Sequence, residues 1–342
     1  MPESVEIDGS HGEGGGSIIR SAVALSAVTG KPCKITGIRT KRENPGLQAQ
    51  HAAAVHAVAK LCGADVKGNE IGSTEIEFMP GEIKGGSLSL NIGTAGSAAL
   101  VLQALMLPAM HCEKPVDIQI TGGTMNKWAP SIDYLQNVTL ATLARFGYEG
   151  ELKLLRHGFY PKGGGMVEAT MRKAELMPVV LTERGRFMSL KGTSTASKEL
   201  EQGQVAERMQ RYAREHLYKV FHETPEVNVA YVDAHSPGGG IDLCALYEHA
   251  VLGSGAIAER AKRAEDVAKE AVDALVASHR SGAPVDKHLA DQLIPYMALA
   301  KGSSAIRAEE ITEHTRTNIW VCGHFVKTPF RIDEKEKQIT CG

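Results

Sequence analysis

The sequence predicts an α+β protein in which three repeated βαβα-ββ units form one large domain and a smaller α/β domain is inserted into the third unit. One observation is an order of strand, helix, strand, helix and two strands over residues 5–80, which returns over residues 87–172. The other is a third copy that starts near Val179 and is interrupted by polar strands and charged helices. We therefore expect a large domain of residues 1–185 and 281–342, with an inserted domain of residues 186–280.

The first unit opens with a short strand at Val5–Asp8 and a glycine-rich turn at 12–16. A helix over 17–28 and a strand over 34–39 follow. The second helix has apolar residues at a 3.6-residue period and ends at Gly63, since glycine is a common helix terminator.

The second unit has the same plan. Residues 97–107 form a helix that is apolar on nearly all sides, so we expect it to be buried. Ser131 is a candidate cap for a helix that ends near Gly147. The expected strands are 88–92, 116–121, 151–156 and 166–171.

The inserted region contains two long charged helices, over about 205–221 and 257–279. The third unit then resumes with residues 291–300 and 317–326. The segment from Thr317 has the alternation of a strand, which places His314 just before a strand.

Composition excludes several classes of protein. The chain has 342 residues, 43% of them hydrophobic and 23% charged, which is globular and not disordered or fibrous. Its net charge of −2 excludes a surface covered in positive charge, so any contact with nucleic acid must come from a local basic patch. There is no signal pattern, no membrane-length apolar run and no Cys-x-x-Cys pair among six cysteines. We expect a reduced, soluble, cytoplasmic protein that does not bind membranes.

The glycine-rich turn at 12–16 suits phosphate, because backbone N–H groups are exposed at the start of the following helix. Arg20 lies one turn into that helix and could add a bidentate contact, and Glu13 could hold a divalent metal. The spacing matches neither of the common nucleotide-binding fingerprints. A tight structural turn with a solvated glutamate is an equal alternative.

A basic cluster contains Arg39 and Arg42 and stands before a helix that begins near Gln50. Arginines at such a position suit phosphate or an RNA end, although a solvated basic loop is the commoner explanation. Residues 156–165 combine basic residues with Pro and three glycines, which indicates either a plain hairpin or a loop that faces RNA.

Polar residues also interrupt apolar segments. Gln103 is polar on an apolar helix, and Asp291 and Gln292 open another apolar segment. A ligand such as a nucleotide could use these groups, but a hydrogen-bonded core glutamine and a helix cap at Asp291 are the simpler alternatives. His314 could be a base, a ligand or a nucleophile, and nothing local distinguishes it among 13 histidines.

Together these segments resemble the RNA 3′-terminal phosphate cyclase family over nearly the whole chain. The most specific stretches are His157-Gly-Phe-Tyr-Pro-Lys-Gly-Gly-Gly165 and His314-Thr-Arg-Thr-Asn318. The other matching stretches are residues 8–22, 44–47, 92–97, 121–124, 183–185 and 289–293, with Gln50 and His51.

The resemblance implies a body like the C-terminal domain of translation initiation factor three, repeated three times. It also implies an ATP-dependent reaction in which a histidine forms a covalent AMP intermediate, AMP passes to an RNA 3′-phosphate end, and the 2′-hydroxyl displaces it to leave a 2′,3′-cyclic phosphate. His314 matches the nucleophile, and Glu13 matches the ligand of a divalent metal (Mg²⁺ or Mn²⁺). Arg39 and Arg42 match contacts to the RNA phosphate, and the ATP contacts are Arg20, Gln50, Gln103, Asp291 and Gln292, with His288 where relatives carry a stacking tyrosine.

Three alternatives stay open. A non-catalytic cyclase-like protein of ribosome assembly would lack the nucleophile, against which His314 argues. An enolpyruvyl transferase has a related repeated body but needs no such histidine. A module that only binds RNA would form no adduct with ATP. The oligomeric state is not indicated by the sequence.

Overall fold

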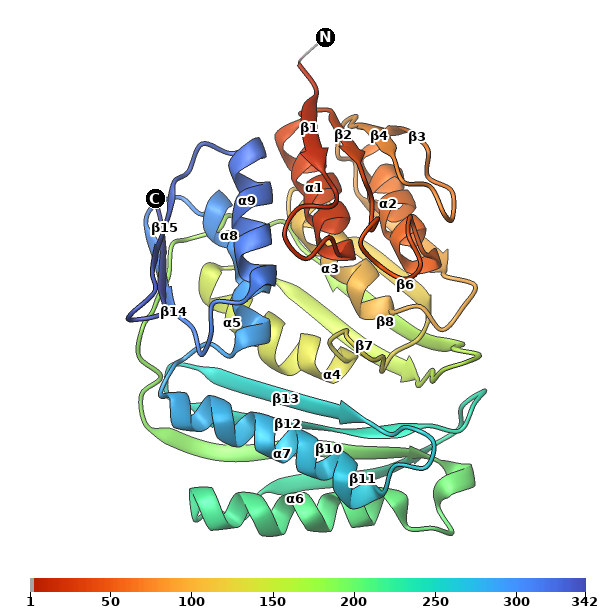
Figure 1. Ribbon diagram of the computed structural model, residues 1–342, viewed down its shortest axis with the longest axis vertical. Coiled ribbons are helices and arrows are strands. Elements are labelled where there is room, and N and C mark those ends of the chain that lie inside the picture. The colour runs from red at the N-terminus through yellow and green to blue at the C-terminus, as the bar shows by residue number, and fades with distance from the viewer. Residues whose placement is uncertain (1–2) are drawn as a thin grey trace.

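The computed structural model describes residues 3–342 and has α+β architecture, as predicted (Figure 1). Three of its four-stranded sheets share one plan, in which the first two strands are parallel and the last two are antiparallel. Their orders are β1-β2-β4-β3, β5-β6-β8-β7 and β9-β14-β16-β15. The strands are β1 (Val5–Asp8), β2 (Cys33–Thr36), β3 (Asp65–Lys67), β4 (Ile76–Met79), β5 (Gly86–Asn91), β6 (Val116–Gly122), β7 (Gly150–Arg156), β8 (Gly165–Met171), β9 (Val180–Leu181), β14 (Ser304–Arg307), β15 (Phe330–Asp333) and β16 (Gln338–Cys341).

Each of these sheets has a helix between its first two strands and another between its second and third strands. The first helices are α1 (Gly16–Thr29), α3 (Ala98–Ala109) and α8 (Lys287–Leu299). The second helices are α2 (Ala49–Cys62), α9 (Glu313–Phe325) and a run over 132–146 made of α4 (Ile132–Tyr134), the π-helical η1 (Leu135–Leu140), α5 (Ala141–Leu143) and the 3-10 turn η2 (Ala144–Phe146). Gly63 ends α2 and Gly147 ends the run 132–146, both in the left-handed conformation, as expected. The Ser131 hydroxyl caps the start of the same run, also as expected.

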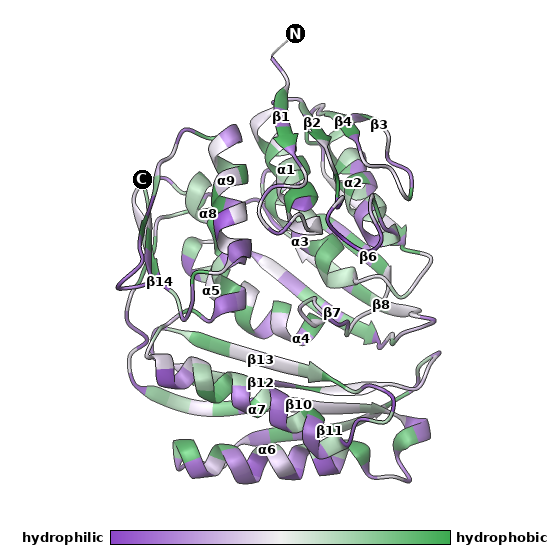
Figure 2. Ribbon diagram, viewed as in Figure 1, coloured by the Kyte–Doolittle hydropathy of each residue, from purple (hydrophilic) through white to green (hydrophobic). Residues whose placement is uncertain are grey.

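Between β9 and α8 the chain forms a fourth sheet, of order β11-β10-β12-β13, in the lower part of Figure 1. Helices α6 (Val205–Phe221) and α7 (Ala264–Ser281) mix purple and green in Figure 2, as amphipathic helices do. Their apolar faces pack with Ile241, Leu243 and Ala245 in a second core. The strands are β10 (Phe187–Ser197), β11 (Glu226–Val232), β12 (Gly239–Tyr247) and β13 (Val251–Ile257), and a short 3-10 turn, η3 (Lys198–Leu200), follows β10.

Side chains on alternate positions of β12 point to the opposite face of this sheet, toward the rest of the protein. Cys244 there belongs to the first core, which joins the helices of the three similar sheets. Asp242 on the same face accepts a hydrogen bond from the Ser131 hydroxyl at 2.6 Å. Two apolar cores are thus joined through a partly polar contact. The domain boundaries that the sequence indicates stay a prediction.

Three element predictions were wrong. The segment 317–326, expected as a strand, is helical up to Phe325, where α9 ends, because Thr315, Asn318, Cys322 and Phe325 are buried at helical spacing. Helix α7 begins at Ala264 and not near 257, since β13 occupies 251–257. Helix α8 begins at Lys287, where Asp286 is the cap, so Asp291 lies inside the helix and does not cap it.

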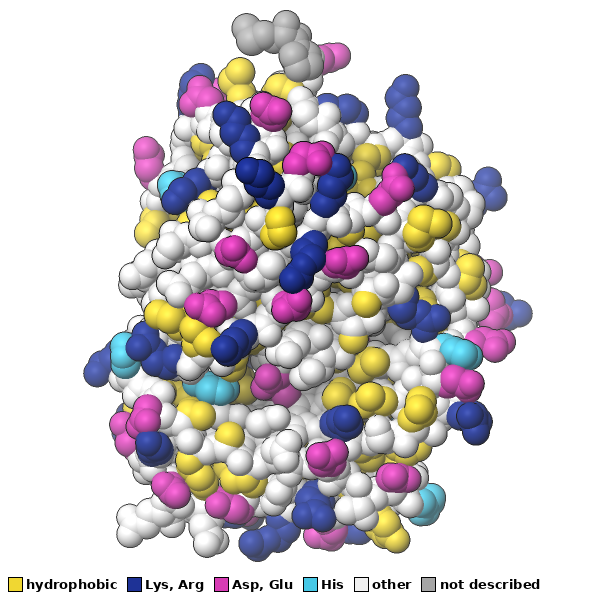
Figure 3. All heavy atoms as spheres, turned by 180° about the vertical axis from the view of Figure 1, so that it is seen from behind, with side chains coloured by type: hydrophobic (Ala, Val, Ile, Leu, Met, Phe, Trp, Pro, Cys, Tyr) yellow, Lys and Arg dark blue, Asp and Glu magenta, His cyan; other side chains and the backbone are white. Residues whose placement is uncertain are grey.

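The surface carries both signs of charge. On the face seen in Figure 3, Lys and Arg side chains are interspersed with Asp and Glu, without a broad area of one sign. This agrees with the net charge of −2. Among residues 3–342, no helix combines the length and the apolarity that crossing a bilayer requires.

Candidate active site

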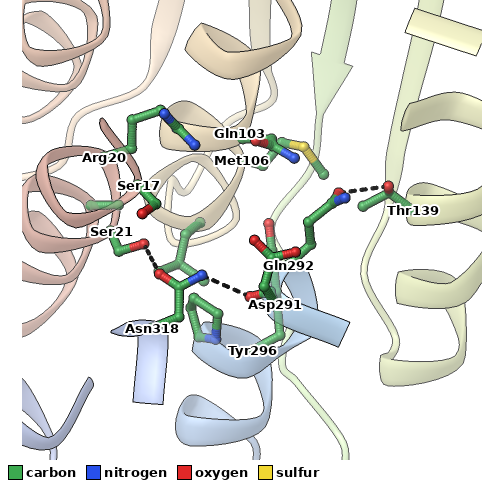
Figure 4. A pocket seen from close by; sticks show the side chains of 13 residues that line it. Ser17, Arg20, Ser21, Gln103, Met106, Thr139, Asp291, Gln292, Tyr296 and Asn318 are labelled. Atoms are coloured by element: carbon green, nitrogen blue, oxygen red, sulfur yellow. Dashed lines mark hydrogen bonds between the residues drawn. The ribbon is translucent and has the colours of Figure 1, made fainter. Parts of the chain in front are cut away.

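A small cleft of about 60 Å³ lies where helices of all three similar units meet (Figure 4). Its polar lining consists of side chains that lie far apart in the sequence. They come from α1, α3, η1, α8 and α9, and are Ser17, Arg20, Ser21, Gln103, Thr139, Asp291, Gln292, Tyr296 and Asn318.

The first helices of the three units supply the cleft from equivalent positions. Arg20 and Ser21 are the fifth and sixth residues of α1, Gln103 is the sixth of α3, and Asp291 and Gln292 are the fifth and sixth of α8. Side chains of the second helical turn therefore converge from three repeats of the same topology. This explains how four predicted nucleotide contacts, spread over nearly the whole chain, come to line one cleft.

Arg20 and Asp291 bring opposite charges to the cleft. Burial lowers the pKa of the Arg20 guanidinium to about 10, although Asp291 and Glu13 favour its charged form. Burial also raises the pKa of Asp291 to about 7, against the opposing effects of His314 and Arg20. The cleft thus holds a cation and a carboxyl that titrates near neutral pH. Such perturbed groups in a cleft are typical of functional sites.

Asn318 joins three helices around the cleft. Its Oδ1 accepts a hydrogen bond from the Ser21 hydroxyl of α1 at 2.8 Å, and its Nδ2 donates to the Asp291 carbonyl of α8 at 3.0 Å (Figure 4). Asn318 itself is buried on α9. It therefore fixes the distances between the elements that carry Arg20 and Asp291.

The two glutamines differ in their bonding. The Gln292 amide donates to the carbonyl of His288 at 2.8 Å and its oxygen accepts from Thr139, so its position is fixed. The half-buried Gln103 side chain makes no hydrogen bond within residues 3–342. Its amide is therefore free to bind a ligand, and the structure does not satisfy it within the core.

His314 lies beside this cleft, in the first turn of α9, and is joined to the lining residue Ser17 through Glu13. Thr312 caps the helix through its hydroxyl, which accepts from the N–H of Thr315. The His314 Nδ1 is 2.7 Å from Oε1 of Glu13, which lies in the glycine-rich turn before α1. The structure thus brings together the two most widely separated members of the predicted site.

Glu13 has two more partners. The Ser17 hydroxyl donates to its Oε1 at 3.0 Å, and the Arg42 guanidinium donates to its Oε2 at 3.2 Å. Burial favours the neutral acid, but the hydrogen bonds from His314 and Ser17 and the charge of Arg42 lower the pKa of Glu13 overall. The carboxylate is therefore ionised at neutral pH and joins the glycine-rich turn, the basic loop and α9.

The same contact sets the chemistry of His314. Its hydrogen bond to Glu13 raises the pKa of the imidazole, which burial opposes only in part. When the imidazole is neutral, Nδ1–H donates to Glu13, so the lone pair is on Nε2. The side chain is 53% exposed. A half-exposed imidazole with a free ring nitrogen can act as a base, a ligand or a nucleophile.

Six predicted residues do not line the cleft. Glu13 contacts His314 and Arg42, as described above, and the other three lie apart from that contact. The Arg39 guanidinium donates to the carbonyls of Asn44 and Gly46 and so shapes the basic loop. The Gln50 Oε1 accepts from the N–H of Ser97 at 2.8 Å. His288 is exposed in the first turn of α8.

Sequence reasoning assigned no role to Ser17 or Asn318. Both have a signal in their spacing. Ser17 follows Glu13 by four residues across the turn before α1, and Asn318 follows His314 by four within α9, where this spacing places both on one side of the helix. The second signal was missed because residues 317–326 were interpreted as a strand.

Glu13 could hold a divalent metal only if the substrate supplies further ligands to the ion. Within residues 3–342 no group of three or more His, Cys, Asp or Glu side chains is arranged to hold a metal. Glu13 already has His314, Ser17 and Arg42 as partners. Mg²⁺ at nucleotide sites is often held by one or two carboxylates with phosphates and waters, which is compatible with a single carboxylate here.

Fold and site together define a protein of repeated α+β units with a carboxylate-bound histidine beside a polar cleft. A family model described as RNA 3′-terminal phosphate cyclase matches residues 11–332. The chain belongs to this family.

Relatives named RNA 3′-terminal phosphate cyclase cover nearly the whole chain. One from Methanosarcina barkeri is 44% identical over 97% of this chain and 97% of its own length. One from Pyrococcus furiosus is 44% identical over 95% of this chain and 94% of its own length, and one from Methanopyrus kandleri is 42% identical over 97% and 96%.

Proposed function

We propose that this protein is an ATP-dependent RNA cyclase that converts an RNA 3′-phosphate end into a 2′,3′-cyclic phosphate. The observation that carries the proposal is the contact of 2.7 Å between His314 Nδ1 and Glu13 Oε1 at the edge of the cleft. It supplies a nucleophile of defined tautomer where a nucleotide can bind. The names of the relatives supply the class of substrate.

In the first step the Nε2 lone pair of His314 attacks the α-phosphorus of ATP. A P–N bond forms, the bond from the α-phosphorus to the bridging oxygen breaks, and pyrophosphate leaves. The imidazole in this adduct keeps its proton on Nδ1. That proton stays in the hydrogen bond to Glu13, whose negative charge stabilises the developing positive charge on the ring.

In the second step an oxygen of the RNA 3′-phosphate attacks the same phosphorus, and the P–N bond breaks. The imidazole is a good leaving group because it departs as neutral His314. In the third step the adjacent 2′-hydroxyl gives its proton to water and attacks the RNA phosphorus, the anhydride bond from this phosphorus to AMP breaks, and AMP leaves. This closure is fast because both groups belong to one ribose.

The remaining residues are proposed to bind substrates. Arg20 offers a half-buried guanidinium for phosphate oxygens, and Asp291 and Gln103 offer groups for the nucleoside. Gln292, Gln50 and His288 are further proposed ATP contacts. Arg39 and Arg42 are proposed to contact the RNA phosphate. For Arg42 this means exchanging its bond to Glu13 for the incoming anion.

A divalent metal, Mg²⁺ or Mn²⁺, is proposed to act with ATP and to be held by Glu13 among the protein groups. When bound, it neutralises charge on the phosphates. A cytoplasmic location is also proposed. The six cysteines are free and buried, which suits a reducing compartment.

The reaction is tested with a 5′-labelled RNA that ends in a 3′-phosphate. The protein with ATP and Mg²⁺ should make the 3′-phosphate resistant to phosphatase and leave an RNA that carries no AMP, whereas the same RNA with a terminal 2′-deoxy ribose should stop at the adenylylated end and retain one AMP. Both arms use one preparation, so folding is the same. Failure to protect the ribose substrate would support the non-catalytic, RNA-binding alternative.

A further inference from the structure

Two loops flank the turn that precedes α3. The first is the connection 123–131 between β6 and α4, where the Asn126 amide donates to the carbonyl of Ala95 at 2.6 Å. The second is the connection 157–164 between β7 and β8. A Cβ added at Gly163 would lie 2.8 Å from the Ala95 Cα, so this loop also packs on the turn. Both loops therefore pack on the same turn, which precedes α3.

Each loop presents an aromatic side chain to solvent. Trp128 is 90% exposed and Tyr160 is 80% exposed, the highest values among the large hydrophobic residues of 3–342. Trp128 also has a positive φ of 59°, a conformation that bulky residues seldom adopt. Two large aromatic rings left in water on neighbouring loops have no role in the core. Observed strain of this kind often marks a functional site.

The loops beneath the rings are well anchored. Phe159 is buried next to Tyr160, and the N–H of Lys162 donates to the Ser236 hydroxyl at 3.2 Å. The Gly158 N–H donates to the Thr124 hydroxyl at 3.0 Å, which joins the two loops directly. The rings are thus held on a rigid base, which lowers the entropy that binding would cost.

Lysines accompany both rings. The Lys127 ammonium lies 5.1 Å from the centroid of the Trp128 ring, and Lys162 is exposed two residues after Tyr160. Lys127 pairs with Glu259 at 3.0 Å, but both side chains are about half exposed, and ion pairs in contact with solvent are weak. Aromatic faces next to cations are the combination that binds single-stranded nucleic acid.

The supporting turn connects these loops to the proposed active site. The Gln50 side chain accepts from the N–H of Ser97 at the end of the turn. Next to Gln50, His51 packs its Nε2 against Gly16, where α1 begins after the glycine-rich turn. An unbroken series of contacts thus runs from the glycine-rich turn to the two aromatic loops.

We propose that Trp128 and Tyr160 stack on bases of the single-stranded RNA that leads to the 3′-phosphate, with Lys127 and Lys162 near its backbone. The proposal rests on the proposed function, because it takes the RNA from that reaction. Stacking accepts any base, so this surface would add affinity without sequence preference. With a net charge of −2, the protein cannot rely on general attraction to a polyanion, and a local surface of this kind supplies the affinity.

The test compares two substrates, a ten-nucleotide RNA with a 3′-phosphate and a dinucleotide with a 3′-phosphate. Trp128→Ala and Tyr160→Ala should each raise KM for the longer RNA by roughly 5- to 100-fold, the range that loss of one stacked base implies. KM for the dinucleotide and the rate of AMP-adduct formation without RNA should stay unchanged. Trp128→Phe should restore most of the affinity, since Phe keeps a ring.

Tyr218→Ala is the matched control, because Tyr218 is a 53% exposed aromatic on α6, away from both loops. Binding of the ten-nucleotide RNA is also measured by fluorescence anisotropy, which needs no catalysis. Unchanged binding and KM in Trp128→Ala and Tyr160→Ala would overturn the proposal. A wild-type protein that binds this RNA through the two rings but makes no cyclic product would instead refute the proposed function alone.

Discussion

Oε1 of Glu13 lies 2.7 Å from Nδ1 of His314, so the first glycine-rich turn and the last helix of the fold meet at one hydrogen bond. The two residues belong to the first and third of the similar units. In the neutral imidazole the contact leaves the lone pair on Nε2, and it raises the pKa of the ring. Glu13 is therefore a positioning residue for His314, in addition to its proposed role toward a metal.

Replacing Glu13 by Gln should change the pH dependence of AMP-adduct formation. The reactive form of His314 is neutral, so the rate rises with pH through the pKa of the imidazole. Glutamine removes the charge that raises this pKa. The acid limb of the profile should then move to lower pH, while the maximal rate falls by about 10- to 100-fold because the charge that stabilises the adduct is lost. Single-turnover rates from pH 5 to 9 measure both effects.

Glu313→Gln is the control for this experiment, since Glu313 is exposed and directly precedes His314. Its profile should match that of the wild type. If Glu13→Gln lowered the maximal rate without moving the acid limb, the raised pKa of His314 would not come from this contact.

Loss of Asn318 should weaken the packing of three helices. Asn318→Ala removes the bonds to Ser21 and to the Asp291 carbonyl, and leaves buried polar groups without partners. We expect the free energy of unfolding to fall by about 1–3 kcal/mol, measured by urea denaturation. Asn137→Ala, at an exposed asparagine, should cost less than about 0.5 kcal/mol. Equal losses in the two variants would contradict the role of Asn318.

Asp242 should make stability depend on pH. It is 8% exposed, and its Oδ2 has no hydrogen-bond partner within residues 3–342. Burial and the nearby Asp133 raise its pKa to about 7. The folded protein then binds an extra proton between about pH 4 and 7, so this group lowers stability as pH rises through that range.

Asp242→Asn removes this titration and keeps an oxygen that can accept from Ser131. The variant should be more stable than the wild type by about 1–2 kcal/mol at pH 8 and close to it at pH 4, measured by thermal denaturation. Asp117→Asn, on the exposed face of β6, should show no such difference. A variant that is less stable than the wild type at pH 8 would show that the ionised Asp242 carboxylate stabilises the fold, which contradicts this account.

Much of the fold could be predicted from the sequence, because strong periodicity and end signals act locally. The helices that end at Gly63 and Gly147 are examples. Helix α9 was misread since Thr315, Thr317, Ile319 and Val321 alternate as in a strand. Only packing shows that the buried residues follow a helical period.

The site could be predicted residue by residue only through the family resemblance. Spacing alone left Gln103 and Asp291 as ambiguous polar residues. Their convergence with Arg20 depends on how three similar units pack around one another, which no local pattern contains. The exposure of Trp128 likewise depends on its positive φ and on the loop beneath it.

The most direct test of the account is the intact mass of the protein after incubation with ATP and Mg²⁺ in the absence of RNA. We predict the added mass of one AMP, lost on treatment with acid, mapped to His314 by peptide analysis and absent from His314→Gln. A folded wild-type protein that gains no mass, or an adduct that persists in His314→Gln, would contradict the assignment of His314 as the nucleophile.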